Sequence, residues 1–411
     1  MRSSRSWLIL PNGTGDRVST FKIRTLNSIA VAGLDRLPRD RYEVASEIGR
    51  PDAILLRSFK MHDMAVPDSL LAVGRAGAGT NNIPVAKLSK IGVPVFNTPG
   101  ANANAVKELV IAGLLMAARN LPQALDYVRS LKGSGEELDK AVESGKKQFV
   151  GFELPKRTLG VVGLGAIGVE VANAALKLGM NVLGYDPAIT VQHAWALSSG
   201  VQKAVNLDDL FARADVVSVH VPLTKSTDKL VNGARLEALP RGAVVLNFSR
   251  DAIVDSGAVI ESLNSGKLRA YVTDFPSREL IDHPKVICLP HLGASTVEAE
   301  ENCAVMVVDN VREFLENGNV TRSVNFPETV LHRTRPNRVA IPHKNVPNMV
   351  AQILTCLAAQ NINIADMLNH SRDELSYTLV DLDAPPSEST LDRIRGIEGI
   401  LSARVLPVID A

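Results

Sequence analysis

The sequence has little of what marks secreted, membrane-spanning or nucleic-acid-binding proteins. Of its 411 residues, three are cysteines and 4% are aromatic. No apolar run approaches the roughly 18 residues that cross a bilayer, and lysine plus arginine (45) nearly equals aspartate plus glutamate (44). This balance argues against a nucleic acid or a membrane as the main partner. The odd number and wide spacing of Cys288, Cys303 and Cys356 predict free thiols, no metal site and a cytoplasmic location.

The composition is that of a folded chain with several domains. Apolar residues make up 45% and charged residues 22%, which excludes a disordered chain. At about 150 residues per domain, the length predicts two or three domains. Residues 1–20 are rich in serine and arginine around a short apolar patch, and we interpret them as a disordered extension or an early start codon. A targeting fragment is the alternative.

Two series of short apolar runs alternate with helical segments, a pattern typical of doubly wound α/β folds. The first series covers residues 21–118, and the second ends at residue 294 after a polar helical stretch that starts at residue 119. A long helix over residues 295–317 follows, and residues 331–337 have the composition of a linker. Residues 338–411 show a β-α-β-β-α-β order, which predicts a C-terminal α+β domain of the ferredoxin-like type.

A glycine-rich run, Gly163-Leu164-Gly165-Ala166-Ile167-Gly168, lies between a predicted strand and a predicted helix. In that context its glycines make a tight turn, let the backbone approach a pyrophosphate and allow close packing of helix on strand. Asp186 ends the next predicted strand, close to the spacing expected for a carboxylate that binds a ribose hydroxyl. No arginine or lysine follows in residues 187–197 to bind a 2′-phosphate, so we expect NAD rather than NADP. A plain turn and a solvated acid are the alternative.

Three polar residues, Arg250, Glu279 and His291, follow three of the later predicted strands. Doubly wound folds bind their ligands at this edge of the sheet. Oxidation of a secondary alcohol needs a base such as histidine, a carboxylate that orients the imidazole, and a cation that holds a substrate carboxylate. Arginine holds a carboxylate with two parallel hydrogen bonds, which lysine does not. Taken singly, the same residues are equally typical of a salt bridge, a solvated acid and a histidine at a strand end.

The ordered set GLGAIG, Asp186, NFSR and PHLGAS resembles the D-isomer-specific 2-hydroxyacid dehydrogenase family over roughly residues 22–411. The C-terminal segments HKNVPNMVAQI and NINIADM resemble an ACT domain, a regulatory fold that binds small molecules. The resemblance implies a Rossmann-type NAD-binding domain (119–294) inserted in a flavodoxin-like substrate-binding domain (21–118 and 295–330), with an ACT domain at 338–411. It also implies a homodimer or homotetramer.

The resemblance assigns roles to individual residues. Arg250, Glu279 and His291 would be catalytic, with His291 as acid and base and Glu279 as its partner. The NAD pocket would be lined by Gly163, Gly165, Ala166, Ile167, Gly168, Asp186, Phe248, Ser249, Arg250, Asp274, His291, Gly293 and Ala294. The substrate would be bound by Arg57, Ser58, Lys60, Gly77 and Asn102. L-Serine would be bound as an effector by His343, Asn345 and Asn363.

The implied reaction is the NAD-dependent oxidation of D-3-phosphoglycerate to 3-phosphohydroxypyruvate. Arg57 and Lys60 form the nearest pair of cations for the substrate phosphate, and Lys146 and Lys147 either add charge or only solvate a helix end. The reduction of glyoxylate or hydroxypyruvate is the alternative within the family, and an NAD-sensing corepressor or scaffold is the alternative outside enzymology.

The sequence departs from the family pattern at three positions. Asp251 follows the catalytic arginine where glycine is usual, and Leu280 follows the catalytic glutamate where proline is usual. Leu280 and the short stretch between Glu279 and His291 make Glu279 the least secure member of the trio. In the C-terminal turn, Asn348 replaces a glycine, and asparagine tolerates a left-handed backbone better than most residues.

Overall fold

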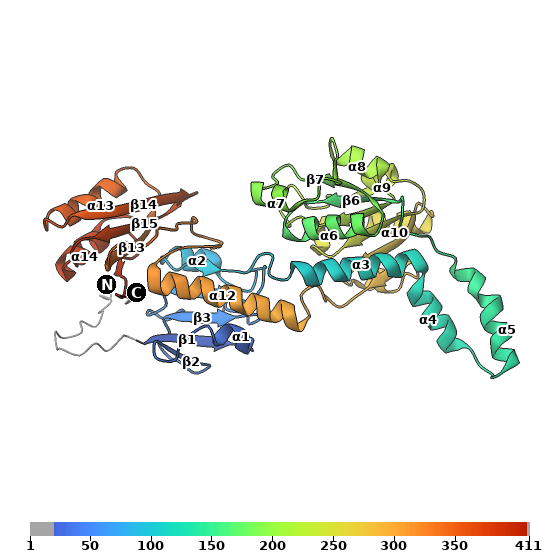
Figure 1. Cartoon of the computed structure of the whole chain (residues 1–411), viewed down its shortest axis with the longest axis horizontal. Helices are drawn as coiled ribbons and strands as arrows, with labels where there is room; N and C mark the ends of the chain where they lie inside the picture. The colour runs from blue at the N-terminus through green and yellow to red at the C-terminus, as the bar shows by residue number, and fades with distance from the viewer. Residues whose placement is uncertain (1–19, 409–411) are drawn as a thin grey trace. The chain divides into compact units, whose positions relative to one another are not determined.

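The computed structural model describes residues 20–408, which fall into two compact units (Figure 1). The first unit combines the ranges Met1–Ala101 and Glu300–Ala411, and the second is the continuous range Asn102–Ala299. The extension predicted for residues 1–20 lies, except for its last residue, outside the described residues.

The first unit contains a parallel five-stranded sheet in the order β2-β1-β3-β4-β5. Its strands are β1 (Phe21–Leu26), β2 (Tyr42–Ala45), β3 (Ala53–Leu56), β4 (Ala72–Arg75) and β5 (Val95–Phe96), and its short helices are α1 (Val31–Leu34) and α2 (Val85–Ser89). All four residues of β3 are buried, as expected of a central parallel strand covered on both faces. This strand order is that of flavodoxin-like folds.

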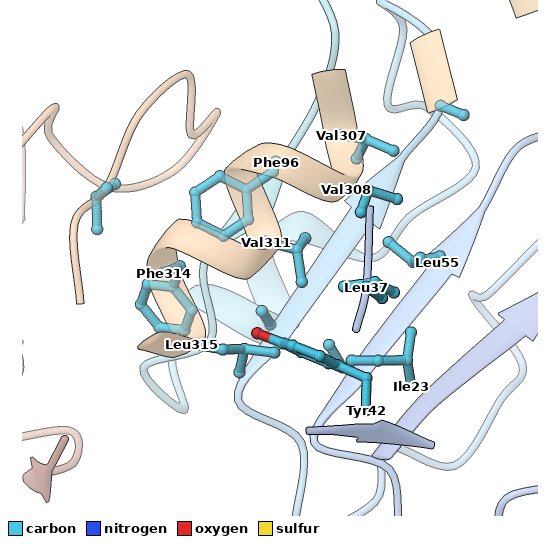
Figure 2. Close-up of a cluster of buried hydrophobic side chains, with 14 of the residues drawn as sticks. Ile23, Leu37, Tyr42, Leu55, Phe96, Val307, Val308, Val311, Phe314 and Leu315 are labelled. Carbon is cyan, nitrogen blue, oxygen red and sulfur yellow. The ribbon is translucent and has the colours of Figure 1, made fainter. Parts of the chain in front are cut away.

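Helix α12 (Val297–Asn317) supplies much of the core of the first unit. Its buried residues Val307, Val311 and Phe314 pack with Ile23 and Leu55 of the sheet in one cluster, which Figure 2 shows. Close packing explains why glycine stands at position 74 in β4, because a Cβ there would lie 2.7 Å from a methyl of Val307.

The C-terminal module follows in the same unit and has an antiparallel sheet in the order β14-β15-β13-β16. Its elements are β13 (Asn337–Lys344), α13 (Met349–Ala358), β14 (Ile364–Arg372), β15 (Leu375–Leu382), α14 (Glu388–Gly396) and β16 (Arg404–Val405). The predicted β-α-β-β-α-β order is therefore present. Ala340, Tyr377, Leu379 and Leu406 of this module belong to the same core cluster as Phe314, so the module and the parallel sheet share apolar packing.

Side chains from the module and the segment before it bind the C-terminal carbonyls of α12. The Arg404 guanidinium donates to the carbonyls of Phe314 (2.5 Å) and Leu315 (3.3 Å). Arg333, Arg338 and the Tyr377 hydroxyl donate to the next three carbonyls, those of Glu316 (3.1 Å), Asn317 (3.1 Å) and Gly318 (2.8 Å). A helix end leaves such carbonyls without helical partners, so the module acts as the cap of α12.

The second unit contains a parallel seven-stranded sheet in the order β12-β11-β10-β9-β6-β7-β8, the arrangement of a Rossmann fold. Its strands are β6 (Thr158–Val162), β7 (Asn181–Tyr185), β8 (Gln202–Lys203), β9 (Val216–Val219), β10 (Ala243–Asn247), β11 (Leu268–Thr273) and β12 (Val286–Cys288). Its helices are α3 (Ala103–Arg119), α4 (Leu121–Ser130), α5 (Glu136–Gly145), η1 (Lys146–Phe149), α6 (Ala166–Lys177), α7 (Val191–Ala196), α8 (Leu207–Arg213), α9 (Gly233–Ala238), η2 (Asp251–Ile253), α10 (Ser256–Asn264) and α11 (Arg278–Ile281).

Helices α4 and α5 form a hairpin that extends away from the sheet of the second unit (Figure 1). The Tyr127 hydroxyl donates to the Ala141 carbonyl (2.7 Å), which joins the two helices. No residue of α4 is buried, and Leu121, Leu125 and Val128 are 42%, 56% and 58% exposed. These three residues recur at helical spacing and so form one exposed apolar stripe.

Within residues 20–408, no helix combines the length and the apolar character needed to cross a bilayer.

Candidate active site

The glycine run joins β6 to α6 as the sequence predicts. Gly163 has a φ of +91°, and a Cβ there would lie 2.6 Å from the His220 carbonyl oxygen. At Gly168 a Cβ would collide with the carbonyl oxygen of Gly163, whereas Gly165 faces open space. Helix α6 starts at Ala166 without a side-chain cap, so its first backbone N–H groups can bind an anion. A turn with open space beside an uncapped helix end fits the pyrophosphate of a dinucleotide.

Asp186 follows β7 at the edge of the sheet where the glycine run lies. Its Oδ2 accepts from the Leu164 N–H (2.8 Å) and its Oδ1 accepts from the Ala188 N–H (2.8 Å). These bonds fix the carboxylate beside the glycine run. Each oxygen keeps a further lone pair, which can accept from a ribose hydroxyl.

His220, which the sequence analysis did not single out, lies beside the same run. It follows β9, is half-buried, and its Nε2 is 2.8 Å from the Ser218 hydroxyl oxygen. Burial lowers the pKa of its imidazole to about 4, so the ring is neutral at physiological pH. Its position after a buried strand next to β6, the point where the strand order reverses, is the signal that could have identified it.

The turn that carries Arg250 is held by a buried asparagine at the end of β10. The Asn247 side chain donates to the Arg250 carbonyl (3.0 Å), and its Oδ1 accepts from the Ser249 N–H (3.1 Å). The Ser249 hydroxyl donates to the Val221 carbonyl, and Phe248 is buried below the turn. The Arg250 side chain is exposed, and Nη1 donates to its neighbour's carbonyl (2.6 Å). The guanidinium therefore faces solvent on a fixed backbone.

His291 adopts an unusual backbone conformation, with a φ of +39°. Left-handed backbone is rare for residues other than glycine and gathers at functional sites. The His291 N–H donates to the Asp274 carbonyl (3.0 Å), and its ring meets Phe275 edge-on at 5.0 Å between centroids. The Asp274 side chain in turn accepts from the Gly293 N–H (3.2 Å). The histidine turn thus donates two hydrogen bonds to Asp274, which joins it to the end of β11.

Asp274 is the buried carboxyl group of this site. It is 1% exposed, and its Oδ1 has no hydrogen-bond partner within residues 20–408. Burial raises the pKa of the Asp274 carboxyl, while His291, the Gly293 N–H and Arg250 act in the opposite direction. Arg250 and His291 thus both lie within electrostatic reach of Asp274.

Glu279 makes no polar contact with this group of residues among those that the structure describes. It is exposed on α11, and within residues 20–408 no hydrogen bond or ion pair joins it to His291. Leu280, which stands where proline is usual, is buried in the core of the second unit.

The predicted substrate-binding residues of the first unit lie after β3 and β4. Arg57 follows β3, and its carbonyl accepts from Arg75 Nε (3.1 Å) and from the Asn82 side chain (3.1 Å). Ser58 and Lys60 are exposed in the same loop. Gly77 has a φ of +147°, and a Cβ there would collide with the Arg75 guanidinium. Arg75, which the sequence analysis did not single out, therefore adds a third cation to this loop cluster.

Two further predictions concern cations and Asn102. In the second unit, Asn102 precedes α3 without capping it, and its Oδ1 is buried without a partner among the described residues. Lys146 forms an ion pair with Glu143, and Lys147 is exposed.

The predicted effector residues are spread over the C-terminal sheet. His343 is 2% exposed, and its Nε2 lies 2.9 Å from the Thr378 hydroxyl and 3.2 Å from Asn369 Oδ1. Burial lowers the pKa of this imidazole. Asn345 and Asn363 are exposed at opposite ends of the sheet, because His343 pairs with Ser376 of β15 and Ile364 pairs with Leu382. Six residues of strand separate the two ends by roughly 20 Å.

Comparisons with known proteins place the chain in a family. The model of the D-isomer specific 2-hydroxyacid dehydrogenase, NAD binding domain, matches residues 111–293. A D-3-phosphoglycerate dehydrogenase of Haemophilus influenzae is 33% identical over 349 residues, which are 82% of this chain and 81% of the relative. The chain belongs to the D-isomer-specific 2-hydroxyacid dehydrogenase family. A second relative of the same name, from Escherichia coli K12, is 30% identical over 352 residues and 82% of each chain.

Other members of the family are longer. The D-3-phosphoglycerate dehydrogenase of Archaeoglobus fulgidus is 36% identical over 300 residues, which are 70% of this chain and 54% of that protein. The chain thus spans about half the length of this archaeal relative.

Solved structures superpose on most of the chain. A protein of Thermus thermophilus gives a TM-score of 0.60 at 27% identity and covers 74% of this chain and 100% of its own. An NADPH-dependent glyoxylate/hydroxypyruvate reductase of Sinorhizobium meliloti, solved with NADP and malonate, gives 0.62 at 25% identity and covers 77% of this chain and 100% of its own.

Membership of the family confirms the prediction of a Rossmann-type NAD-binding domain, because the family model covers the glycine run, Asp186, Arg250 and His291. The roles of the individual residues remain predictions.

Proposed function

We propose that the chain oxidises D-3-phosphoglycerate to 3-phosphohydroxypyruvate with NAD, the first step of phosphorylated L-serine biosynthesis. The observation that carries this proposal is the set of D-3-phosphoglycerate dehydrogenases that are 30–36% identical over 70–82% of the chain. Bound NAD supplies the hydride acceptor, and the glycine run with the uncapped α6 and Asp186 would hold it.

The second unit supplies groups suited to the hydroxy-acid part of the substrate. The His291 imidazole would accept the proton of the C2 hydroxyl, since histidine is the side chain that most often serves as a general base. The exposed Arg250 guanidinium on its fixed backbone would hold the substrate carboxylate with two hydrogen bonds. The buried Asp274 carboxyl would stabilise the protonated imidazole through the charge interaction between them. Glu279 stays a proposed partner of His291, on its sequence position alone.

The first unit supplies groups suited to a phosphate. Arg57, Arg75 and Lys60 lie in or beside the loops that follow β3 and β4, the edge of a parallel sheet where ligands bind. Ser58 adds an exposed hydroxyl to the same loop. Lys146 is paired with Glu143, so we assign no phosphate-binding role to it.

A coupled assay tests the proposed function. The purified full chain is expected to produce NADH from D-3-phosphoglycerate when the product is removed, and to use NADP poorly. Preferred reduction of glyoxylate or hydroxypyruvate would favour the alternative within the family. Binding of NADH without turnover of any 2-hydroxy acid would favour a corepressor or scaffold.

We further propose that residues 338–411 are an ACT domain that binds L-serine, joined by residues 331–337 to a substrate-binding domain (21–118 and 295–330) that carries the NAD-binding domain (119–294). The ferredoxin-like order of its strands supports this. Because Asn345 and Asn363 are exposed at opposite ends of one sheet, a complete serine site would take them from two copies of the module. The buried His343 would not contact serine itself but would position Thr378 and Asn369 through hydrogen bonds. Calorimetry with L-serine should show binding that N345A and N363A each abolish.

The apolar stripe of α4 supports a homo-oligomer. Leu121, Leu125 and Val128 expose a stripe that a second copy would cover. Light scattering of the wild type should give at least a dimeric mass, and L125E with V128E should lower it. We also propose a cytoplasmic location, because all three cysteines are free.

A further inference from the structure

One of the proposed phosphate-binding cations, Arg57, already forms an ion pair with an acid. Arg57 Nη1 lies 2.6 Å from Oε1 of Glu300, a residue near the start of α12. The two side chains are 36% and 44% exposed, so the pair stands at the surface of the first unit where a ligand can reach it. An ion pair of this exposure is weak and exchangeable.

The surroundings fix the arginine and leave Glu300 as the nearest opposing charge. The Arg57 carbonyl is held by Arg75 Nε and by the Asn82 side chain, whose amide also donates to the Phe59 carbonyl (2.8 Å). The buried Cys303 thiol beside them is influenced by the charges of Arg57, Arg75 and Glu300 together, which places the three charged groups in one cluster. The loop is therefore rigid at its backbone, and the guanidinium partner is the part that can change.

We propose that Glu300 is a specificity-determining residue that competes with the substrate phosphate for the Arg57 guanidinium. This inference rests on the proposed function. A phosphate carries up to two negative charges and binds arginine with two hydrogen bonds, so it can displace a carboxylate from the guanidinium. A hydroxyl in the place of the phosphate has no charge and leaves the ion pair closed. Glu300 thus weakens binding of the phosphorylated substrate without affecting the unphosphorylated one, and so lowers the preference of the site for the phosphate.

The experiment compares E300Q with wild type on D-3-phosphoglycerate and on its unphosphorylated analogue, D-glycerate. The variant keeps the shape of the side chain and removes its charge. We expect the KM for D-3-phosphoglycerate to fall about two- to fivefold, the range given by weak exposed ion pairs, with kcat unchanged. The KM for D-glycerate should not change. The difference between E300Q and wild type should shrink at high salt.

Glu301 provides a matched control, because it is exposed on the same helix and has no ion pair with Arg57. E301Q removes the same charge and should leave the KM at its wild-type value. R57Q should raise the KM, and adding E300Q to R57Q should then have no effect, which shows that the two residues act as a pair. An unchanged or higher KM in E300Q, or an equal fall in E301Q, would overturn the proposal.

Failure of the proposed function gives a different result. A wild-type chain without turnover of D-3-phosphoglycerate would refute the activity, and titration with inorganic phosphate by calorimetry would still test the pair. Tighter phosphate binding by E300Q than by wild type and E301Q would support the competition. Equal binding by all three would refute it.

Discussion

The ion pair between Arg338 of β13 and Asp381 of β15 should be the most sensitive single point of the first unit. Both side chains are 0% exposed, and two hydrogen bonds join them, with Arg338 Nη2 2.8 Å from Asp381 Oδ2. Arg338 also donates to the carbonyls of Asn317 (3.1 Å) and Leu331 (2.8 Å). R338M removes the cation and leaves the buried carboxylate of Asp381 without a counter-charge.

The expected loss of unfolding free energy in R338M is about 3–5 kcal/mol, the range for breaking a buried pair by removing one partner. The double variant R338M/D381L removes both charges, and apolar replacement of a buried pair is often neutral. What remains lost are the two hydrogen bonds to the carbonyls of Asn317 and Leu331, about 1–3 kcal/mol in total. The double variant should therefore be more stable than R338M.

Native-state hydrogen exchange, followed by mass spectrometry of peptides, measures this effect unit by unit. Peptides from β13 and β15 should exchange faster in R338M, while peptides from β6 and β9 of the second unit serve as the internal reference. R36M is the matched control, because the Arg36–Asp309 pair is exposed (53% and 40%) and solvent-exposed ion pairs contribute little to stability. Equal exchange in R338M and R36M, or a double variant no better than R338M, would contradict the reasoning.

Four further outcomes are expected. H291A should lose about 10²–10⁴-fold in kcat, as for other general acid–base groups, and keep its NADH affinity by fluorescence titration; more than half the wild-type kcat would remove His291 from the mechanism. E279Q and D274N compared in the same assay identify the carboxylate that acts with His291, and we expect the larger loss in D274N because Asp274 is buried beside it. D186A should lower the ratio of kcat/KM for NAD to that for NADP, and a wild type that uses both equally would refute the role of Asp186. Burial lowers the pKa of folded His220 to about 4, whereas an unfolded histidine has a pKa near 6.5. The free energy of unfolding should therefore fall by about 3 kcal/mol as the pH drops from 6.5 to 4. In thermal melts, the Tm of H220Q should depend less on pH than that of the wild type.

Much of the fold follows from local sequence patterns. Buried parallel strands such as AILL in β3 and AVVLN in β10 are continuous apolar runs. The spacing of apolar residues that marks helices and strands can be read from neighbouring residues, without any knowledge of distant contacts. Asn348 likewise adopts the left-handed backbone that its residue type tolerates, with a φ of 65°. Both signals lie within a few neighbouring residues.

The features that the sequence did not reveal depend on partners far apart in the chain. Arg57 and Glu300 are separated in sequence by the whole inserted second unit, and Arg338 meets Asp381 only through the antiparallel register of β13 on β15. The same register buries His343, to which the resemblance to an ACT domain assigns an effector-binding role. The left-handed backbone of His291 is set by the bonds of its turn to Asp274, and no local preference of histidine announces it.

The packing of the C-terminal module on the first unit determines when that unit can fold during synthesis. The core of the first unit includes Ile23 near one end of the chain and Leu406 near the other. At about 5–20 residues per second, the ribosome needs roughly 20–80 s to make the residues between them. The second unit, a continuous segment, is complete long before. The core of the first unit can therefore be completed only after residue 406 has been synthesised, whereas the second unit can fold earlier. A chain truncated at residues 331–337 would lack Leu379 and Leu406, and the core of its first unit would stay incomplete.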